Sequence, residues 1–443
     1  MKSYVYFPGS TTIIVLLSIV VVVQSNNNCD EWPKTCPGTF PRSPYKQTWL
    51  MNLSTIIMPC NDTGFTDPNS TLGWGIVDFD WSNAKGTGTA DGWVKHKPMD
   101  DEELLFKQVQ MTTAATPGTT VWIYRNTVYG YPWYTSVRLT LEDPAYAPWY
   151  FKFAGKGPWF SKKCDSAIPN LCSDLYHSQE QSPGFPHGDG DCAAPGCDCG
   201  KGVPCGFYVW NHSSTAVVHG QTFQEWFIHS YMLNKVGSSP LVSGFFWDDV
   251  WNKECNIHDQ VKDTCKDMGL TDADLVQVTA DYENNMKALR EAILNAGKFS
   301  WQMLWTGGAD DNIGGTGLTT LVTKDNCAAT LRSLCDVNSP AQTRAMAYGL
   351  SGSPEKRNPD LLQDLVNFLL IRGPYSWLGW GWNGCSREYY FPPEFNVDYG
   401  QPIGNHVCQE TTPNSEVFIR KYSKSTVMMD CKKWQGSVTF PYK

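Results

Sequence analysis

The stretch that decides the fold reads Gly244-Phe245-Phe246-Trp247-Asp248-Asp249-Val250-Trp251, where an apolar run meets two adjacent carboxylates. A short apolar run bounded by turn residues is typical of a buried strand in a parallel sheet. A carboxylate inside a dry core needs a partner, so the acidic pair belongs at the carboxyl end of the strand. Parallel α/β folds place their active sites at these ends. One Asp could simply cap the next helix, but two, flanked by Trp247 and Trp251, favour a functional site.

A second stretch, Gly73–Trp81, also ends in acids. Because side chains alternate along a strand, Ile76, Asp78 and Asp80 share one face. One acid inside the strand and another at its end predict a barrel interior that becomes polar near its mouth.

Strands and helices alternate along most of the chain. For example, a capping box at Thr271–Asp274 begins an amphipathic helix that ends near Gly297. This alternation indicates an α/β fold with a parallel sheet, and the strand count favours a (β/α)8 TIM-like barrel over an open sheet. The eighth strand is not located by the sequence. The seven expected strands are 73–81, 120–126, 206–211, the stretch that ends at Asp248, 299–305, 345–350 and 375–382.

Two segments interrupt the alternation. Residues 127–205 form a long insertion with six cysteines, and loops of this length inside a compact domain are usually functional. Its Cys and His residues also allow a zinc site, although an exported chain favours disulfides. After residue 384 the helices stop, and short strands predict a small β-rich module. The expected division is a signal peptide (1–25), a glycosylated leader (26–70), the barrel with its insertion (71–384) and the C-terminal module (385–443).

The N-terminus predicts export. An apolar core runs from Ile13 to Val23, and Val23-Gln24-Ser25 offers a signal-peptidase site. This core is too short to span a bilayer comfortably, and no later segment is long and apolar enough. N-glycosylation sequons begin at Asn52, Asn61, Asn69 and Asn211. We therefore expect a secreted, extracellular glycoprotein with no membrane contact after signal cleavage.

The sixteen cysteines are an even number, as is usual for chains that fold in an oxidising compartment. A cysteine nucleophile is not expected among paired thiols. The pairing is left open, and the candidates close in sequence are Cys29–Cys36, Cys164–Cys172, Cys255–Cys265 and Cys385–Cys408.

The charge balance limits the class of partner. Lys plus Arg number 35 against 44 for Asp plus Glu, and this formal net charge of −9 argues against nucleic acid or an anionic membrane surface. The chain also has 19 Trp, 20 Tyr and 20 Phe, more than a core alone usually needs. Flat rings with one polar edge suit sugar faces, although they also suit packing. A polysaccharide or oligosaccharide is the expected partner, and the oligomeric state is left open.

Strand ends converge in a barrel, so acids far apart in the sequence can face one another. Asp78/Asp80, Asp248/Asp249 and Asp310/Asp311 lie at such ends, and Glu180 lies in the insertion. One protonated and one ionised carboxylate are the groups that cleave glycosidic bonds. We expect catalysis from Asp248, Asp249 and Asp80. The residues expected to bind sugar are Asp78, Trp81, Arg125, Glu180, Trp247, Trp251, Trp305 and Trp380.

Other chemistries have less support. The sequence contains no Gly-rich phosphate loop, no His-Glu-x-x-His and no nucleophile elbow. Asp189, Asp191 and Asp198 could bind calcium, but their spacing matches no known ligand loop. No cofactor and no metal are therefore expected.

Several segments occur in the order Gly73–Trp81, Gly244–Trp251, Leu361–Arg372 with Tyr375–Trp382, Asp398–Pro402 and Phe418–Tyr422. In this order they resemble a largely uncharacterised group of exported proteins that are predicted to be glycoside hydrolases. The resemblance spans roughly residues 72–440. It implies a TIM barrel followed by a C-terminal β-hairpin module with an Arg-x-Tyr-x(n)-Val pattern. It also implies that Asp248 and Asp249 lie in the active site, without telling which acid is the nucleophile.

These features predict a secreted glycoside hydrolase that cleaves an extracellular or cell-wall polysaccharide with paired carboxylates. The alternative is a catalytically inactive, carbohydrate-binding or wall-structural protein on the same barrel. Fold similarity alone cannot separate the two. The geometry of the acids can, because an enzyme needs two carboxylates that face the same bond.

Overall fold

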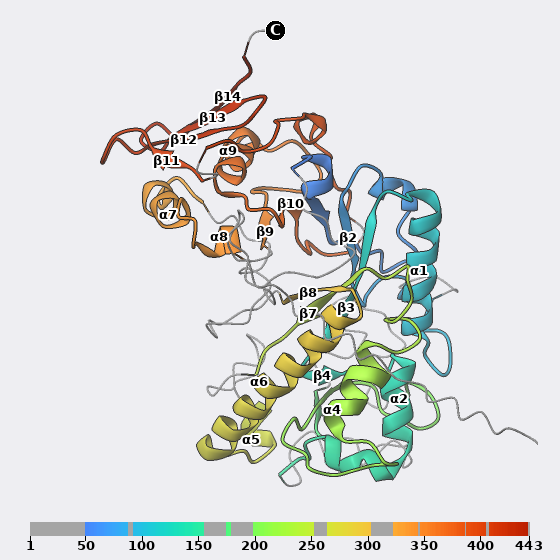
Figure 1. Ribbon diagram of the computed structural model, residues 1–443. Coiled ribbons are helices and arrows are strands. Elements are labelled where there is room, and N and C mark those ends of the chain that lie inside the picture. The colour runs from blue at the N-terminus through green and yellow to red at the C-terminus, as the bar shows by residue number, and fades with distance from the viewer. Residues whose placement is uncertain are drawn as a thin grey trace, which may run out of the picture.

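The computed structural model describes residues 49–86, 92–154, 174–178, 198–251, 264–302, 322–343, 346–385, 387–404 and 407–441. A parallel sheet lies at the centre of the molecule (Figure 1). A C-terminal antiparallel sheet lies at one end, and the segment around α2 (Thr135–Glu142) and α4 (Phe223–Trp226) lies at the other.

The central sheet has seven parallel strands in the order β8-β7-β3-β2-β1-β10-β9. This order follows the chain around a circle, because the first strand pairs with the last, and it is the order of a (β/α)8 barrel. One strand position, between β8 and β9, is not filled by the described residues, and residues 303–321 lie outside them. The strands are β1 (Thr55–Ile57), β2 (Ile76–Phe79), β3 (Thr120–Asn126), β7 (Gly244–Asp248), β8 (Phe299–Gln302), β9 (Met346–Gly349) and β10 (Ser376–Trp380).

Aromatic rings from distant strands meet inside the curved sheet. Trp122 of β3 stacks on Phe299 of β8 at 4.7 Å, and Trp377 of β10 lies edge-on to Phe299 at 5.2 Å. Such contacts between strands that are not neighbours show a packed barrel interior. Gly244 makes room for this layer, since a Cβ there would lie 2.6 Å from Trp122 Nε1.

Alternation then shows which side chains share the interior. Tyr124 and Asn126 lie on the same face of β3 as Trp122. The register pairs Trp122 with Asp78, and it pairs Asn126 with Asp248. The predicted interior, apolar at one end and polar at the mouth, is therefore confirmed.

The expected helices cover the outside of the sheet. α6 (Asp272–Asn295) begins at the predicted capping box, in which the Thr271 hydroxyl accepts from Asp274 N and the Asp274 carboxylate accepts from Thr271 N. α1 (Asp101–Ala115) packs against β3. The remaining helices are α5 (Thr264–Asp267), α7 (Cys327–Leu334), α8 (Pro340–Thr343), α9 (Leu361–Ile371), a π-helix (Phe227–Met232) and 3-10 turns at Asn52–Ser54, Pro68–Thr71, Pro144–Trp149 and Pro393–Asn396.

One strand prediction and part of the leader prediction are wrong. The strand expected at 206–211 exists as β6 (Phe207–Val209), but it pairs with β4 (Tyr129–Gly130) and β5 (His177–Ser178) in a separate antiparallel sheet. β1 was expected to be part of an exposed leader, yet Ile56 and Ile57 are buried between β2 and β10. A three-residue strand that is buried on both faces shows no alternation, so no periodic pattern marks it.

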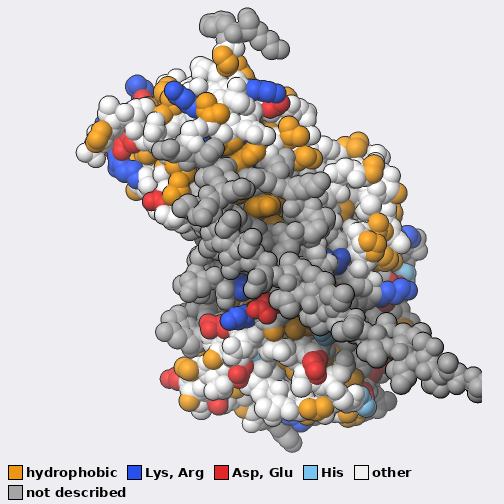
Figure 2. Space-filling model, viewed as in Figure 1, with side chains coloured by type: hydrophobic (Ala, Val, Ile, Leu, Met, Phe, Trp, Pro, Cys, Tyr) orange, Lys and Arg blue, Asp and Glu red, His pale blue; other side chains and the backbone are white. Residues whose placement is uncertain are grey.

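The C-terminal module is an antiparallel sheet that packs on α9. Its strands are β11 (Gln409–Glu410), β12 (Val417–Lys421), β13 (Thr426–Asp430) and β14 (Gln435–Thr439). Hydrophobic side chains also show at the surface of this end of the molecule (Figure 2). The exposed hydrophobic residues of the module include Ile403, Met428 and Phe440.

The Arg-x-Tyr pattern of this module has a structural role. Buried Arg420 donates from Nη1 to the carbonyl oxygens of Leu369, Leu370 and Arg372 at 3.1, 3.0 and 2.7 Å. The Tyr422 hydroxyl also donates to Leu369 O. The last carbonyls of a helix have no partners within it, so this pair of side chains caps α9.

The disulfides join distant segments. Cys327 pairs with Cys431 and Cys335 with Cys408, which ties the C-terminal module to the region of α7. Cys60 pairs with Cys385 across a sequence separation of 325 residues, and Cys199 pairs with Cys205 within the insertion. The predicted pair Cys385–Cys408 is therefore wrong, because each partner lies closer to a cysteine far away in the sequence. Cys29–Cys36, Cys164–Cys172 and Cys255 lie outside the described residues.

Within the described ranges, no helix has the length and apolar character needed to cross a membrane.

Candidate active site

Acids from β2 and β7 meet at the carboxyl end of the barrel. Asp78 lies within β2, Asp80 follows it directly, and Asp248 ends β7. Strand β3 lies between β2 and β7. The three carboxyl groups are electrostatically coupled, because Asp80 and Asp248 both raise the pKa of Asp78. Of the acids expected to converge, Asp78, Asp80 and Asp248 are near enough to influence one another's ionisation.

Asp78 is the most isolated of these acids. Its side chain is 0% exposed, and neither carboxylate oxygen has a hydrogen-bond partner among the described residues. Burial, then the charges of Asp80 and Asp248, raise its pKa well above the usual value. A low-dielectric environment disfavours the ionised form, and like charges add to this effect.

Asp80 is held by the residue two positions later. Its Oδ2 accepts hydrogen bonds from Ser82 N at 3.0 Å and from the Ser82 hydroxyl. Burial raises the pKa of Asp80 to about 6; the Ser82 bonds oppose this rise and Asp248 adds to it. A carboxyl group with a pKa in this range can give or take a proton near neutral pH.

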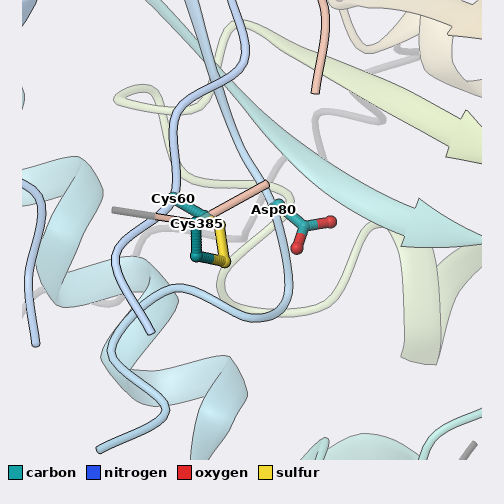
Figure 3. Close-up of side chains that lie close together, drawn as sticks. All are labelled: Cys60, Asp80 and Cys385. Carbon is teal, nitrogen blue, oxygen red and sulfur yellow. A yellow bond between two sulfur atoms is a disulfide. The ribbon is translucent and has the colours of Figure 1, made fainter. Parts of the chain in front are cut away.

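The Cys60–Cys385 disulfide lies beside Asp80 (Figure 3). Ser82 lies between them, with its hydroxyl oxygen 3.8 Å from Cys60 Sγ and 3.3 Å from Cys385 Sγ. Cys60 comes after β1 and Cys385 after β10, so the bridge fixes the mouth where the first and last strands pair. One carboxylate oxygen and the two sulfurs lie within 4.8 Å of one another. Sulfurs in a disulfide are not thiolates, so this group is no metal site.

Asp248 and Asp249 differ, as alternation predicts. Asp248 is half-buried and accepts a hydrogen bond from the Tyr124 hydroxyl at 2.8 Å. Asp249 has a positive φ of 58°, which turns the chain sharply after β7. Its carboxylate is buried and accepts from Asn126 Nδ2 at 2.6 Å. Burial and then the charge of Asp248 raise the pKa of Asp249, while the Asn126 bond opposes the rise.

A hydrogen-bond network joins Asp248, the last residue of β7, to Asp249, which follows it. Tyr124 and Tyr131 share a bond between their hydroxyls at 2.9 Å, and Asn126 Nδ2 donates to the Tyr131 hydroxyl at 2.6 Å. Burial raises the pKa of both tyrosines well above the usual value, so both hydroxyls keep their protons. We did not single out Tyr124, Tyr131 or Ser82 from the sequence. Alternation from Trp122 could have found Tyr124, but no local pattern marks the other two.

Trp81 is the predicted aromatic residue that borders the acids. It is partly buried, and it packs on Trp133 at 5.2 Å and on Tyr131 at 5.7 Å. Behind it, stacked pairs join Tyr124 to Tyr131, Tyr131 to Trp133 and Trp133 to Trp93. These rings pack around Trp81, which follows Asp80 in the sequence, and Lys85 Nζ lies over the Trp81 ring at 5.6 Å from its centroid.

Three other predicted sugar platforms are wrong. Trp247, Trp251 and Trp380 are buried in the core. Trp247 pairs in register with Arg125, on the face of the sheet opposite to the acids. The large aromatic that is exposed after β10 is Trp382, at 45%. A position near an acid in the sequence therefore did not distinguish a buried tryptophan from an exposed one.

Arg125 is also corrected. Its guanidinium is 0% exposed and pairs with Glu102 Oε1 at 2.9 Å, between the rings of Tyr134 and Tyr231. It therefore joins the outer face of β3 to α1 and does not reach the mouth.

Glu180, Trp305, Asp310 and Asp311 lie outside the described residues, so their expected roles stay predictions.

No protein-family model and no curated protein matches the chain. Among solved structures, it is similar to a maltogenic amylase from S. marinus, with 12% identity and a TM-score of 0.40 over 90% of this chain and 67% of that one. A Nostoc punctiforme debranching enzyme has 10% identity and a TM-score of 0.37 over 88% and 91% of the two chains. A cyclic α-maltosyl-(1→6)-maltose hydrolase from Arthrobacter globiformis has 11% identity and a TM-score of 0.40 over 90% and 98%. The fold assignment rests on the strand order, and these weak likenesses add nothing to it.

Proposed function

We propose that the chain is a secreted glycoside hydrolase that cleaves an extracellular or cell-wall polysaccharide. The observation that carries the proposal is the pair formed by Asp80 and Asp248. These acids come from two strands, lie at the carboxyl end of the barrel and are electrostatically coupled. Two carboxyl groups in different environments, one protonated and one ionised, are the machinery of glycosidic cleavage.

The environments suggest the two roles. Burial raises the pKa of Asp80 to about 6, which suits a general acid that protonates the leaving oxygen. Asp248 is more exposed, and its carboxylate accepts a hydrogen bond from the Tyr124 hydroxyl. This environment suits an ionised base or nucleophile. Buried Asp249, held by Asn126, would orient Asp248 through the Tyr124–Tyr131 network. Trp81 would stack on a sugar ring next to Asp80.

Export is part of the proposal. It is supported by the apolar N-terminal segment, the four sequons and the described disulfides, which agree with an oxidising compartment.

The test is a screen of the purified protein against a panel of polysaccharides, with detection of new reducing ends and of the product anomer by NMR. Cleavage by the native protein, lost in Asp248→Asn, supports the proposal. Binding of a polysaccharide without any product would support the alternative instead, an inactive carbohydrate-binding protein on the same barrel.

A further inference from the structure

α9 is buried on two sides, because it lies between the barrel and the C-terminal sheet (Figure 1). Towards the C-terminal sheet, a Cβ on Gly436 of β14 would lie 3.0 Å from Val366 Cγ2. Towards the barrel, the ring of Phe368 lies edge-on to the ring of Tyr348 of β9, with a centroid distance of 5.8 Å. A helix that is covered on both sides is normally apolar on both, so a polar side chain buried in it needs a hydrogen-bond partner.

Two polar side chains of α9 are nevertheless buried. Asp364 is 5% exposed and Asn367 is 4% exposed, and their spacing along the helix puts both on the same face as Ile371. Asp364 Oδ2 accepts hydrogen bonds from Ser351 N at 2.8 Å and from the Ser351 hydroxyl at 2.7 Å. The other carboxyl oxygen, Oδ1, and both polar side-chain atoms of Asn367 have no hydrogen-bond partner in the described part of the chain.

Tyr348 brings a third buried polar group to this interface from β9. It is 4% exposed, and its hydroxyl has no hydrogen-bond partner among the described residues. A cavity between α9 and the barrel is lined by Tyr348, Asp364 and Asn367, with Phe368, Ile371 and Leu378 as apolar neighbours. The cavity offers about 20 Å³ for the centre of a water molecule, and one buried water needs about 10–15 Å³ by this measure.

We propose that one water molecule binds in this cavity and bridges Tyr348, Asp364 and Asn367, so that it joins α9 to the barrel. The four polar atoms are two donors, the Tyr348 hydroxyl and Asn367 Nδ2, and two acceptors, Asp364 Oδ1 and Asn367 Oδ1. Water has two donors and two acceptors, which match this set, and a buried water typically makes about three hydrogen bonds. A cation could not accept from Asn367 Nδ2, and an anion would lie against the Asp364 carboxyl group. The inference does not depend on the proposed activity.

The direct test is a crystal structure of the full chain. We expect electron density for one water within about 3.2 Å of at least three of the four polar atoms. A dry cavity would overturn the inference. So would a metal ion such as calcium, which is recognised by oxygen ligands at about 2.3–2.6 Å.

Tyr348→Phe tests the same water in solution, because it removes the hydroxyl and keeps the ring. If water bridges the hydroxyl, the variant loses a hydrogen bond nearly as strong as a direct one, and the equilibrium constant of unfolding should rise about three- to tenfold in denaturant titration. Tyr389→Phe is the matched control, because the Tyr389 hydroxyl donates to Met58 O at 2.8 Å, and the constant should rise by a similar factor. A constant that rises in Tyr389→Phe but stays equal or falls in Tyr348→Phe would overturn the inference, because removal of a buried hydroxyl without a partner is neutral or stabilising.

Discussion

Two regions of this molecule bury like charges, and they treat them differently. At the end of α9, Arg372 and Arg420 are both buried within one cluster. Arg420 donates to three carbonyls, and Arg372 donates to Ser54 and lies over the rings of Trp49 and Phe368. At the mouth, Asp78 is buried as deeply, but no described group donates a hydrogen bond to it.

The difference separates a structural cluster from a functional one. Burial of a charge is unfavourable unless hydrogen bonds or opposite charges compensate. Arg420 receives this compensation from the backbone carbonyls that it caps at the end of α9. Arg372 receives it from the Ser54 hydroxyl and from the rings of Trp49 and Phe368. Asp78 lacks it within the described residues, so the fold keeps this acid at a cost in stability. Such a cost is expected at a functional site.

The largest effect on stability is expected at the arginines. Arg420→Ala leaves the carbonyls of Leu369, Leu370 and Arg372 without their donor and opens a cavity. We expect the free energy of unfolding to fall by about 3–5 kcal/mol in denaturant titration. Lys421→Ala, at the exposed next position of β12, should change it by about 0.5 kcal/mol or less. Equal losses of stability in the two variants would show that Arg420 does not stabilise the fold by capping α9.

Substitution of Asp80 should change the free energy of unfolding in the opposite direction, towards greater stability. A carboxyl group whose folded pKa is raised contributes stability below its unfolded pKa and loses it as pH rises through the folded value, here about 6. Asp80→Asn should therefore stabilise the protein above pH 6 by up to about 3 kcal/mol, with the gain fading below about pH 4. The measurement is the free energy of unfolding of both proteins between pH 4 and 8. A variant that is less stable at every pH would show that the fold compensates Asp80 after all.

A smaller effect is expected at Ser82. Its hydroxyl stabilises the charged form of Asp80, so Ser82→Ala should raise the pKa of Asp80 above 6. The loss of one hydrogen bond to a charged group corresponds to about 1.5–3 kcal/mol at most. The pH dependence of unfolding should move to higher pH, and the same substitution in the Asp80→Asn background should not move it. A shift that persists in that background would mean that Ser82 acts through the disulfide or the loop and not through Asp80.

Much of the barrel could be predicted from the sequence. Strands with clear alternation or a compact apolar run, such as β2, β3 and β7, lie where expected, and so does α6 with its capping box. β1 could not be found, because three consecutive buried residues have no period. β6 was found, but its sheet was not, since antiparallel pairing with β4 depends on how the insertion folds back.

The positions of the acids in the candidate site could be predicted from the sequence, but the residues packed around them could not. Alternation from Ile76 was enough to place Asp78 and Asp80 on one face, and the apolar run before Asp248 placed that residue at a strand end. The burial of Trp247 and Trp251 depends on which face of the sheet the helices cover. The Cys60–Cys385 bridge joins residues 325 positions apart, so no local spacing indicates it.

The most direct test of the central claim compares the turnover of Asp80→Asn and Asp248→Asn on the cleaved polysaccharide with that of Asp272→Asn, a control at an exposed position at the start of α6. We predict that each mouth variant loses about a thousandfold or more in kcat, roughly 4 kcal/mol of barrier, while the folded structure and the Asp272→Asn control are unchanged. Near-native turnover in both mouth variants would contradict the account, because Asp80 and Asp248 would then take no part in catalysis.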